Sequence, residues 1–379
     1  MRVLITAASL DAVGGVQVYV RDLAAWLLAH DHSPVVYAPR LGEAAAQLRR
    51  LTIPVIDDLS TMAVAPDVIH GNSAVETMTA MLHFSAAPAL FTCHAWRGPT
   101  GHPPHFPRLL RCVAVDDTCA DRLRHEEGVP PEKLTVLLNG VDTARYPART
   151  TPLPPRPRRA LVFGNAAHET THLPAVREAC QRAGFEVVDV AASSSGTFVE
   201  APELILGDYD LIFAKAKCAL EGMASGAAVI LCDVAGVGGM VRSADVARLR
   251  RQNFGARTLV HPVDTDVLAR EIAAYDAADA AVVSETIRRT AASDDLHARI
   301  AELCEQLIAE QARTPIDRDA EGRAAAAFLR LVTASDTEHA SRLNLVVQAT
   351  HRVLQAPVVG PVLTRAARWL VRRGRKGAW

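Results

Sequence analysis

Short apolar runs that alternate with helical patterns are the feature of this sequence that most restricts its fold. Residues 2–6 (RVLIT) have the character of a buried strand, and residues 16–29 then carry apolar side chains at helical spacing. Further strand patterns follow, with helical stretches between several of them, at residues 35–37, 68–70, 89–92, 113–115 and 135–138. This alternation predicts an α/β fold, with a doubly wound parallel sheet covered by helices on both faces.

A proline-rich segment, PLPPRPRR at 152–159, interrupts the alternation. Its four prolines cannot donate backbone hydrogen bonds and hold the chain extended, which indicates an interdomain linker. Strand and helix patterns then restart at 160–165, 173–183, 186–190, 211–214 and 228–232. We expect an N-terminal α/β domain over 1–151, the linker at 152–159, a second α/β domain over 160–312 and a helical extension over 313–379.

Composition excludes several classes of protein. The chain has 379 residues, 49% of them hydrophobic, which suffices for two globular domains. No apolar stretch approaches the roughly 20 residues of a membrane span, and MRVLITAASL lacks the pattern of a secretory signal, so a cytoplasmic location is expected. Seven scattered cysteines give neither a disulfide framework nor a zinc pattern. A net charge of −1 argues against a nucleic-acid partner.

The C-terminal tail departs from this balance. Eight basic residues and no acidic residue follow Glu338. Between Pro361 and Arg373, apolar and basic side chains occupy opposite helical faces. Such a segment suits the anionic inner face of a membrane, where each basic residue contributes on the order of 1 kcal/mol. The alternative is a helix packed on the N-terminal domain and followed by a solvated basic end.

Candidate binding residues lie where strands give way to helices. Gly14 and Gly15 follow the first strand, where paired glycines let the backbone approach an anion, although a plain tight turn also explains them. No GxGxxG is present, so a nicotinamide cofactor is not expected. His94 follows the strand ALFTC and could bond a sugar hydroxyl or serve a structural role. His102 and His105 could join it as metal ligands, but no carboxylate is nearby in sequence and no metal is expected.

The segment LIFAKAKCALEGMASGAAVILCD at 211–233 carries the strongest signal. Its strand-to-helix pattern places Lys215 and Lys217 at a helix N-terminus, where the helix dipole disfavours cations unless an anion lies between them. Two of the chain's four lysines are here, which favours phosphate binding. Glu221 lies four residues after Lys217, so a surface ion pair is the alternative. The apolar neighbours of Glu221 favour a position facing a cleft.

Taken in chain order, several segments resemble GT-B glycosyltransferases of the family 4 type, also called glycosyl transferases group 1. The matching segments are Gly14-Gly15 with its helix, DVIHGNS at 67–73, FTCH at 91–94, VAVDDTCADRL at 113–123, VLLNGVDTARY at 136–146, ALVFGN at 160–165, ALEGMASGAAVI at 219–230 and VDTDVLAREI at 263–272. The resemblance covers roughly residues 1–275. It implies two Rossmann-like domains facing a cleft.

The resemblance also implies an activity. A sugar would pass from a nucleotide-sugar donor to a glycan, lipid-linked or other glycoconjugate acceptor, with retention of configuration and without metal or cofactor. Glu221 would bind the ribose hydroxyls, His94 the donor sugar and Gly15 the diphosphate. Gly14, Gly164 and Asn165 are further candidates at the glycine turns.

Three parts of the sequence depart from the family pattern. Phe213 stands where a glutamate is expected, the usual Arg and Lys after residue 164 are missing, and AGVGGMV at 235–241 replaces a proline-glutamate loop. We predict that Lys215 and Lys217 supply the missing positive charge. Gly238 and Gly239 would then allow close backbone approach to the donor.

Three functions remain open from the sequence. The first is a glycosyltransferase of polysaccharide or other glycoconjugate synthesis. The second is a catalytically silent homologue that binds nucleotide-sugar or glycan as an assembly partner, which the departures above motivate. The third is a nucleotide-sugar epimerase, which needs a pair of cleft carboxylates that the sequence does not clearly provide.

Overall fold

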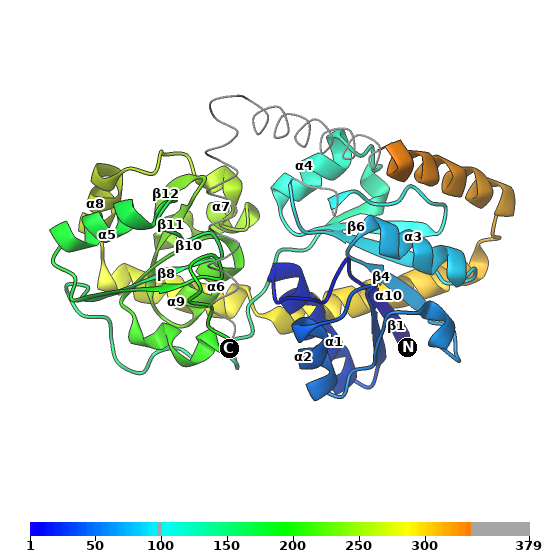
Figure 1. Ribbon diagram of the computed structural model, residues 1–379, viewed down its shortest axis with the longest axis horizontal. Coiled ribbons are helices and arrows are strands. Elements are labelled where there is room, and N and C mark those ends of the chain that lie inside the picture. The colour runs from blue at the N-terminus through cyan, green and yellow to red at the C-terminus, as the bar shows by residue number, and fades with distance from the viewer. Residues whose placement is uncertain (97–100, 335–379) are drawn as a thin grey trace, which may run out of the picture. The chain divides into compact units, whose positions relative to one another are not determined.

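The computed structural model describes residues 1–96 and 101–334 (Figure 1). Residues 1–104 and 108–316 form one unit and contain two parallel sheets. Residues 105–107 and 317–334 belong to a second unit, in which residues 318–334 are helical. The predicted α/β fold with a helical C-terminal extension is confirmed. The basic segment at 361–373 lies outside the described residues.

The first sheet has the strand order β3-β2-β1-β4-β5-β6-β7, with all neighbouring strands parallel. Its strands are β1 (Arg2–Thr6), β2 (Ser33–Tyr37), β3 (Val55–Ile56), β4 (Val68–Gly71), β5 (Ala89–Cys93), β6 (Leu109–Ala114) and β7 (Leu134–Val136). Its connecting helices are α1 (Gly15–Ala29), α2 (Glu43–Arg50), α3 (Ala74–His83) and α4 (Asp117–His125). Figure 1 shows α3 and α4 on the opposite side of this sheet from α1 and α10 (Ser293–Arg313).

The core of the first sheet includes a helix from far along the chain. Leu296, Ile300, Cys304 and Leu307 of α10 are buried among side chains of β1, α1 and α2. Their spacing of three and four residues places them on one helical face. The domain boundaries remain a prediction, but the structure packs α10 with the N-terminal core, whereas the sequence interpretation grouped residues up to 312 with the second domain.

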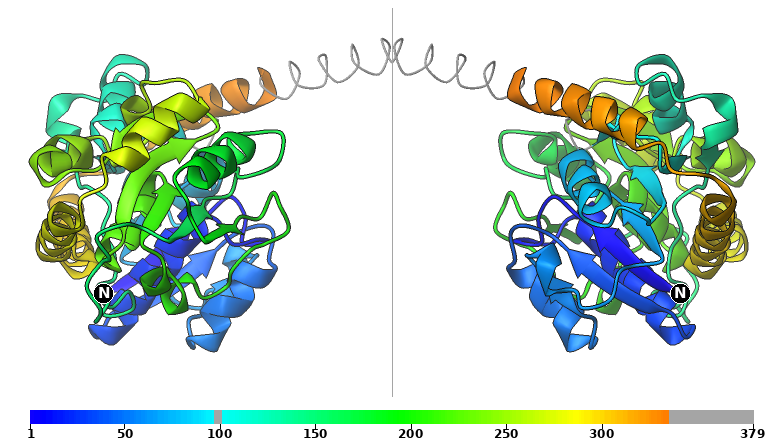
Figure 2. Two further views of the ribbon diagram at one scale, coloured as in Figure 1. Left: turned by 90° about the vertical axis from the view of Figure 1, so that its left-hand side faces the viewer. Right: turned by 90° about the vertical axis from the view of Figure 1, so that its right-hand side faces the viewer.

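The second sheet has the order β12-β11-β10-β8-β9. Its strands are β8 (Arg159–Phe163), β9 (Val187–Ala191), β10 (Leu211–Ala214), β11 (Ala228–Asp233) and β12 (Gly236–Met240). Alternate side chains of these strands pack against α6 (Ala216–Ala224), α7 (Val246–Arg251) and α9 (Ala277–Thr290) on one face, and against α5 (Leu173–Arg182) and α8 (Thr265–Ala273) on the other. Helices therefore cover both faces of this sheet (Figures 1 and 2).

Residues 235–241, interpreted from the sequence as a loop, instead form the antiparallel edge strand β12, which pairs with β11. A Cβ atom on Gly238 would lie 2.5 Å from the Thr258 carbonyl oxygen, and Gly239 has a φ of +86°. Glycine is therefore required at both positions by strand packing and backbone conformation.

Two chain segments connect the two sheet regions, one between β7 and β8 and the other between α9 and α10. The Val141 N–H donates to the Ala291 carbonyl at 2.8 Å, and the Ser293 N–H donates to the Val141 carbonyl at 3.0 Å. A Cβ atom on Gly140 would lie 2.6 Å from the Cα atom of Ser293. The absence of a side chain at Gly140 lets the two backbones meet.

Within the described ranges, no helix combines the length and the apolar character that a bilayer span requires.

Candidate active site

Residues that follow strands of both sheets, together with residues of α10, line a cavity of about 180 Å³. The lining includes Gly15, Tyr19 and Asp22 of α1, His94 after β5, Ala216 and Lys217 at the start of α6, and His297 of α10. Helix α1 follows β1 and α6 follows β10, so the cavity lies beyond the carboxyl ends of strands in both sheets. Ligands of open α/β sheets bind at this edge, where the strand order reverses.

His94 contributes an uncharged imidazole to the cavity. Its Nε2 lies 2.7 Å from Oδ1 of Asn72, whose amide nitrogen in turn donates to the Thr6 carbonyl at 3.1 Å. With the Asn72 oxygen as acceptor, Nε2 is the donor and Nδ1 is left as an acceptor. Burial lowers the pKa of His94 to about 4. The ring is therefore neutral at pH 7 and suited to a sugar hydroxyl.

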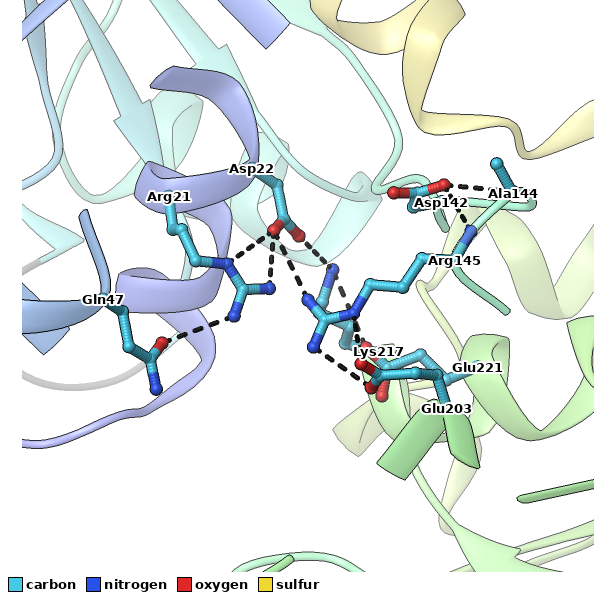
Figure 3. Close-up of polar contacts among 9 residues, drawn as sticks. All are labelled: Arg21, Asp22, Gln47, Asp142, Ala144, Arg145, Glu203, Lys217 and Glu221. Atoms are coloured by element: carbon cyan, nitrogen blue, oxygen red, sulfur yellow. Dashed lines mark hydrogen bonds and ion pairs between the residues drawn. The ribbon is translucent and has the colours of Figure 1, made fainter. Parts of the chain in front are cut away.

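Lys217 links the two sheets across the cavity (Figure 3). Its Nζ lies 3.4 Å from Oδ2 of Asp22 on α1 and 3.8 Å from Oε1 of Glu221, one turn further along α6. The Asp22 carboxylate also contacts Arg21 at 2.6 Å and Arg145 at 4.0 Å. Burial alone would raise the pKa of Asp22, but Lys217, Arg21 and Arg145 hold it below its ordinary value. Asp22 is therefore an ionised carboxylate at the centre of a cationic cluster.

Arg145 is fixed by a second set of contacts. Its guanidinium contacts Glu203 at 3.1 Å, and its backbone N–H donates to Asp142 at 2.9 Å (Figure 3). The cluster around Asp22 thus joins α1, α6 and the segment after β7.

The ion pair between Lys217 and Glu221 that the sequence suggested is present, but Glu221 is buried, with 5% of its surface exposed, and it does not line the cavity. Its carboxylate faces Lys217, and Tyr146 lies close enough to lower its pKa. Burial raises the pKa of Glu221, while Lys217 acts in the opposite direction. Phe213, at the position where a second glutamate was expected, is fully buried in the core and supplies no side chain to the cavity.

The structure does not bring Lys215 together with Lys217. Lys215 forms an ion pair with Asp233 at the end of β11, its side chain is 40% exposed, and it does not line the cavity. His172, before α5, is close enough for this pair to affect it: burial lowers the pKa of His172, Asp233 raises it and Lys215 lowers it further. The two lysines therefore face different carboxylates.

The predicted glycine sites fall into two groups. Gly15 lines the cavity, and a Cβ atom there would meet no atom within 4 Å, so open space lies beside the backbone. Gly14 precedes it in an extended conformation, with a φ of −142°. Gly164 and the exposed Asn165 lie in the loop after β8, and the Asn165 carbonyl accepts from the Ser194 N–H at 3.2 Å.

Gly238 and Gly239 lie in β12 against Thr258 and Glu271 and do not line the cavity. The packing of β12 explains why both positions are glycine, and no ligand is needed for that explanation. The binding roles of all the named glycines, and of Asn165, stay predictions.

Strained backbone gathers beside the cavity. Ala216, Asn253 and Phe254 have φ values of +50°, +52° and +49°, which residues other than glycine rarely adopt. The Ala216 N–H donates to the Phe254 carbonyl at 2.9 Å, and both Ala216 and Asn253 line the cavity. Such conformations cost about 1–3 kcal/mol each and concentrate at functional sites.

We expect Ala216→Gly to raise the free energy of unfolding by about 1 kcal/mol, because glycine adopts this φ without steric cost. Chemical denaturation of the two proteins measures the difference. Ala219→Gly, in the same helix but without a positive φ, is the matched control and should lower stability by about 1 kcal/mol. A loss of stability in both variants would contradict the assignment of strain to residue 216.

Sequence reasoning missed Asp22 and His297. Both lie within amphipathic helices, where an acid or a histidine carries no signal of its own. In the part of the chain that the structure describes, His, Cys, Asp and Glu side chains form no cluster of three or more suited to a metal ion. His102, considered as a partner of His94, instead contacts Glu127.

Comparisons with known proteins agree with this architecture. The family model described as Glycosyltransferase Family 4 matches residues 13–145. The resemblance to GT-B glycosyltransferases of the family 4 type is thereby confirmed. No curated protein matches the chain.

Solved structures extend the similarity of the fold over both sheets. A glycosyltransferase from Rickettsia africae ESF-5 has a TM-score of 0.60 at 15% identity, over 81% of this chain and 98% of that one. HepE of Anabaena, in complex with UDP and glucose, has a TM-score of 0.59 at 14% identity, over 81% and 100%. Sucrose-phosphate synthase of Thermosynechococcus elongatus has a TM-score of 0.56 at 12% identity, over 82% and 99%. The fold of this chain is therefore GT-B.

Proposed function

We propose that this protein is a glycosyltransferase that moves a sugar from a nucleotide-sugar donor to a glycan, lipid-linked or other glycoconjugate acceptor. The observation that carries the proposal is the meeting of Lys217, the neutral His94 and the open backbone of Gly15 in one cavity between the carboxyl ends of the two sheets. HepE, which shares the fold, binds UDP and UDP-glucose. The nucleotide-sugar would be a substrate, and we propose no cofactor.

The second sheet would hold the nucleotide. The buried carboxylate of Glu221 is suited to the two ribose hydroxyls, since a charged acceptor makes stronger hydrogen bonds than a neutral one. Lys217 and the first-turn amides of α6 that follow Ala216 would face the diphosphate. That group gains negative charge as it leaves the sugar, so a fixed ammonium and the positive end of a helix lower the barrier.

The first sheet would hold the sugar and the acceptor. His94 is neutral at pH 7 and would bond a hydroxyl of the donor sugar, and the resemblance to family 4 supports transfer with retention of configuration. Peripheral attachment to the inner face of a membrane through the basic tail also stays a proposal.

Asp22 imposes a condition on this function. In the structure Lys217 has two carboxylate partners. A diphosphate would have to compete with Asp22 for the same ammonium. Donor affinity is therefore expected to fall with rising ionic strength, because added salt screens the attraction between the diphosphate and the cationic cluster.

A panel of nucleotide diphosphates and nucleotide-sugars, screened by thermal unfolding, tests the proposal. A ligand at 100 times its Kd stabilises the native state by about 2.7 kcal/mol, which raises Tm by several degrees. UDP and UDP-glucose are the first pair to test, followed by the guanine and adenine counterparts. If no member of the panel shifts Tm, the proposed function is wrong.

A catalytically silent homologue is the second candidate. The pairing of both lysines with carboxylates, together with Phe213 in place of a glutamate, favours it. Hydrolysis or transfer of a bound donor that depends on Glu221 would exclude it. Binding without any turnover, across donors and acceptors, would favour it. Product analysis would separate both from an epimerase.

A further inference from the structure

The wall of the cavity that α10 supplies contains a histidine with no predicted role. His297 lies on the first turns of α10, lines the cavity and has only 4% of its surface exposed. Its Nδ1 is buried and has no hydrogen-bond partner among the described residues. Buried polar atoms in folded proteins are nearly always hydrogen-bonded, and an unbonded one is costly to keep. The other ring nitrogen of His297, Nε2, is not enclosed in this way and has no hydrogen-bond partner among the described residues, so it is the atom that can meet a ligand.

We propose that His297 binds a hydroxyl of the sugar carried by the nucleotide donor; this inference rests on the proposed function. The residue reaches the cavity from α10, a third element beside α1 and α6. Its role would be to position the sugar ring and contribute to the choice of donor. His297 is therefore assigned as a specificity-determining residue.

The uncharged state of His297 at pH 7 favours a sugar over a phosphate as its ligand. Burial lowers the pKa of His297 to about 4, although Asp22 acts in the opposite direction. The ring is neutral at pH 7 and offers one donor and one acceptor, which matches a hydroxyl. A phosphate would instead bind at Lys217, whose charged ammonium makes stronger hydrogen bonds to an anion than a neutral imidazole does.

The size of the cavity supports the same ligand. Pockets that hold whole drug-sized ligands measure about 300–1,000 Å³. The cavity of about 180 Å³ can enclose only part of a nucleotide-sugar. Its lining also includes His94 and the uncharged side chains of Asn139, Asn253 and Ser293, which suit a polyol.

The test compares each nucleotide with its own sugar conjugate in wild-type protein and in His297→Leu. Isothermal titration with UDP and UDP-glucose, UDP and UDP-N-acetylglucosamine, and GDP and GDP-mannose separates the nucleotide contribution from the sugar contribution. We expect the Kd of the sugar conjugate to rise about tenfold in His297→Leu, while the Kd of the nucleotide alone stays within twofold. Tm should stay the same or rise, because an unbonded polar group is removed from a buried position.

Two further variants separate binding from packing. His297→Gln keeps a donor and an acceptor and should recover part of the affinity for the sugar conjugate. Cys304→Ala removes a buried side chain from the same face of α10, outside the cavity, and should lower Tm without changing the ratio of the two Kd values.

Each outcome has a definite reading. If the nucleotides bind and His297→Leu leaves the ratio of the two Kd values unchanged, or weakens both ligands equally, the inference is wrong and the proposed function stands. If no nucleotide pair binds the wild-type protein, the proposed function fails and this inference fails with it.

Discussion

Replacing Lys217 by alanine is expected to weaken binding of the nucleotide-sugar donor by about 100-fold, which corresponds to roughly 2.7 kcal/mol. The ammonium is the cationic group at the start of α6 that lines the cavity, and it lies between the carboxylates of Asp22 and Glu221. Its removal takes away the partner of the diphosphate. It also leaves two partly buried carboxylates facing the ligand, and their charge repels the incoming phosphates.

Titration of UDP and UDP-glucose into the two proteins measures this change, with thermal unfolding as a check that the variant folds. Lys215→Ala is the matched control, since that lysine lies two residues away, pairs with Asp233 and does not line the cavity. It should weaken binding less than fivefold. An equal, large loss in both variants would show that both lysines serve the diphosphate, as the sequence interpretation proposed. Unchanged binding in both would remove the phosphate site altogether.

The elements that carry the site were predictable because they depend on local patterns. Strand β10 and helix α6 follow from an apolar run and a helical repeat, and the structure places both within one or two residues of the expected bounds. The apolar neighbours of Glu221 predicted a position facing a cleft, whereas the structure buries this side chain and does not place it in the lining of the cavity. For the strand and the helix themselves, local pattern, turn chemistry and packing agree, which is the condition under which sequence reasoning succeeds.

The partners of those residues could not be predicted, because they come from distant parts of the chain. Asp22 is 195 residues away from Lys217, and within α1 it has the pattern of an acid on a solvated face. The return of α10 to the first core depends on which sheet offers an unfilled apolar face, and its own sequence is equally compatible with either sheet. His297 enters the cavity only as a result of that return.

The prediction of a loop at the glycines after β11 was wrong for another reason. Two adjacent glycines at 238 and 239 have the composition of a flexible loop, and β propensity argues against a strand. The pairing of β12 with β11, and the close approach of the Thr258 carbonyl, override that propensity. Glycine occurs in strands where another part of the backbone approaches closely, so the same residues fit both structures.

The second large effect is expected from Glu221→Gln, which preserves shape and removes the charge. Turnover of the donor should fall by about 100-fold, because two charge-assisted hydrogen bonds to the ribose become ordinary ones. Stability at pH 7 should not fall, since burial raises the pKa of Glu221 above its ordinary value of 4.5. A raised pKa means that folding favours the protonated form. Stability is therefore lost as the pH rises from the unfolded pKa to the folded pKa, the loss is complete above the folded pKa, and the amide avoids that cost.

The pH dependence separates a binding carboxylate from a structural one. In the wild-type protein the donor binds to the ionised form of Glu221, so its affinity should rise as the pH increases through the raised pKa of that group. In Glu221→Gln the affinity should be weak and independent of pH over the same range. Titrations of UDP-glucose between pH 5 and pH 8 provide the measurement, because its diphosphate is esterified at both ends and lacks the terminal phosphate proton that UDP loses at about pH 6. If both proteins show the same pH profile, Glu221 is not the group that holds the ribose, and its burial beside Tyr146 and Lys217 serves only to join α6 to the segment after β7.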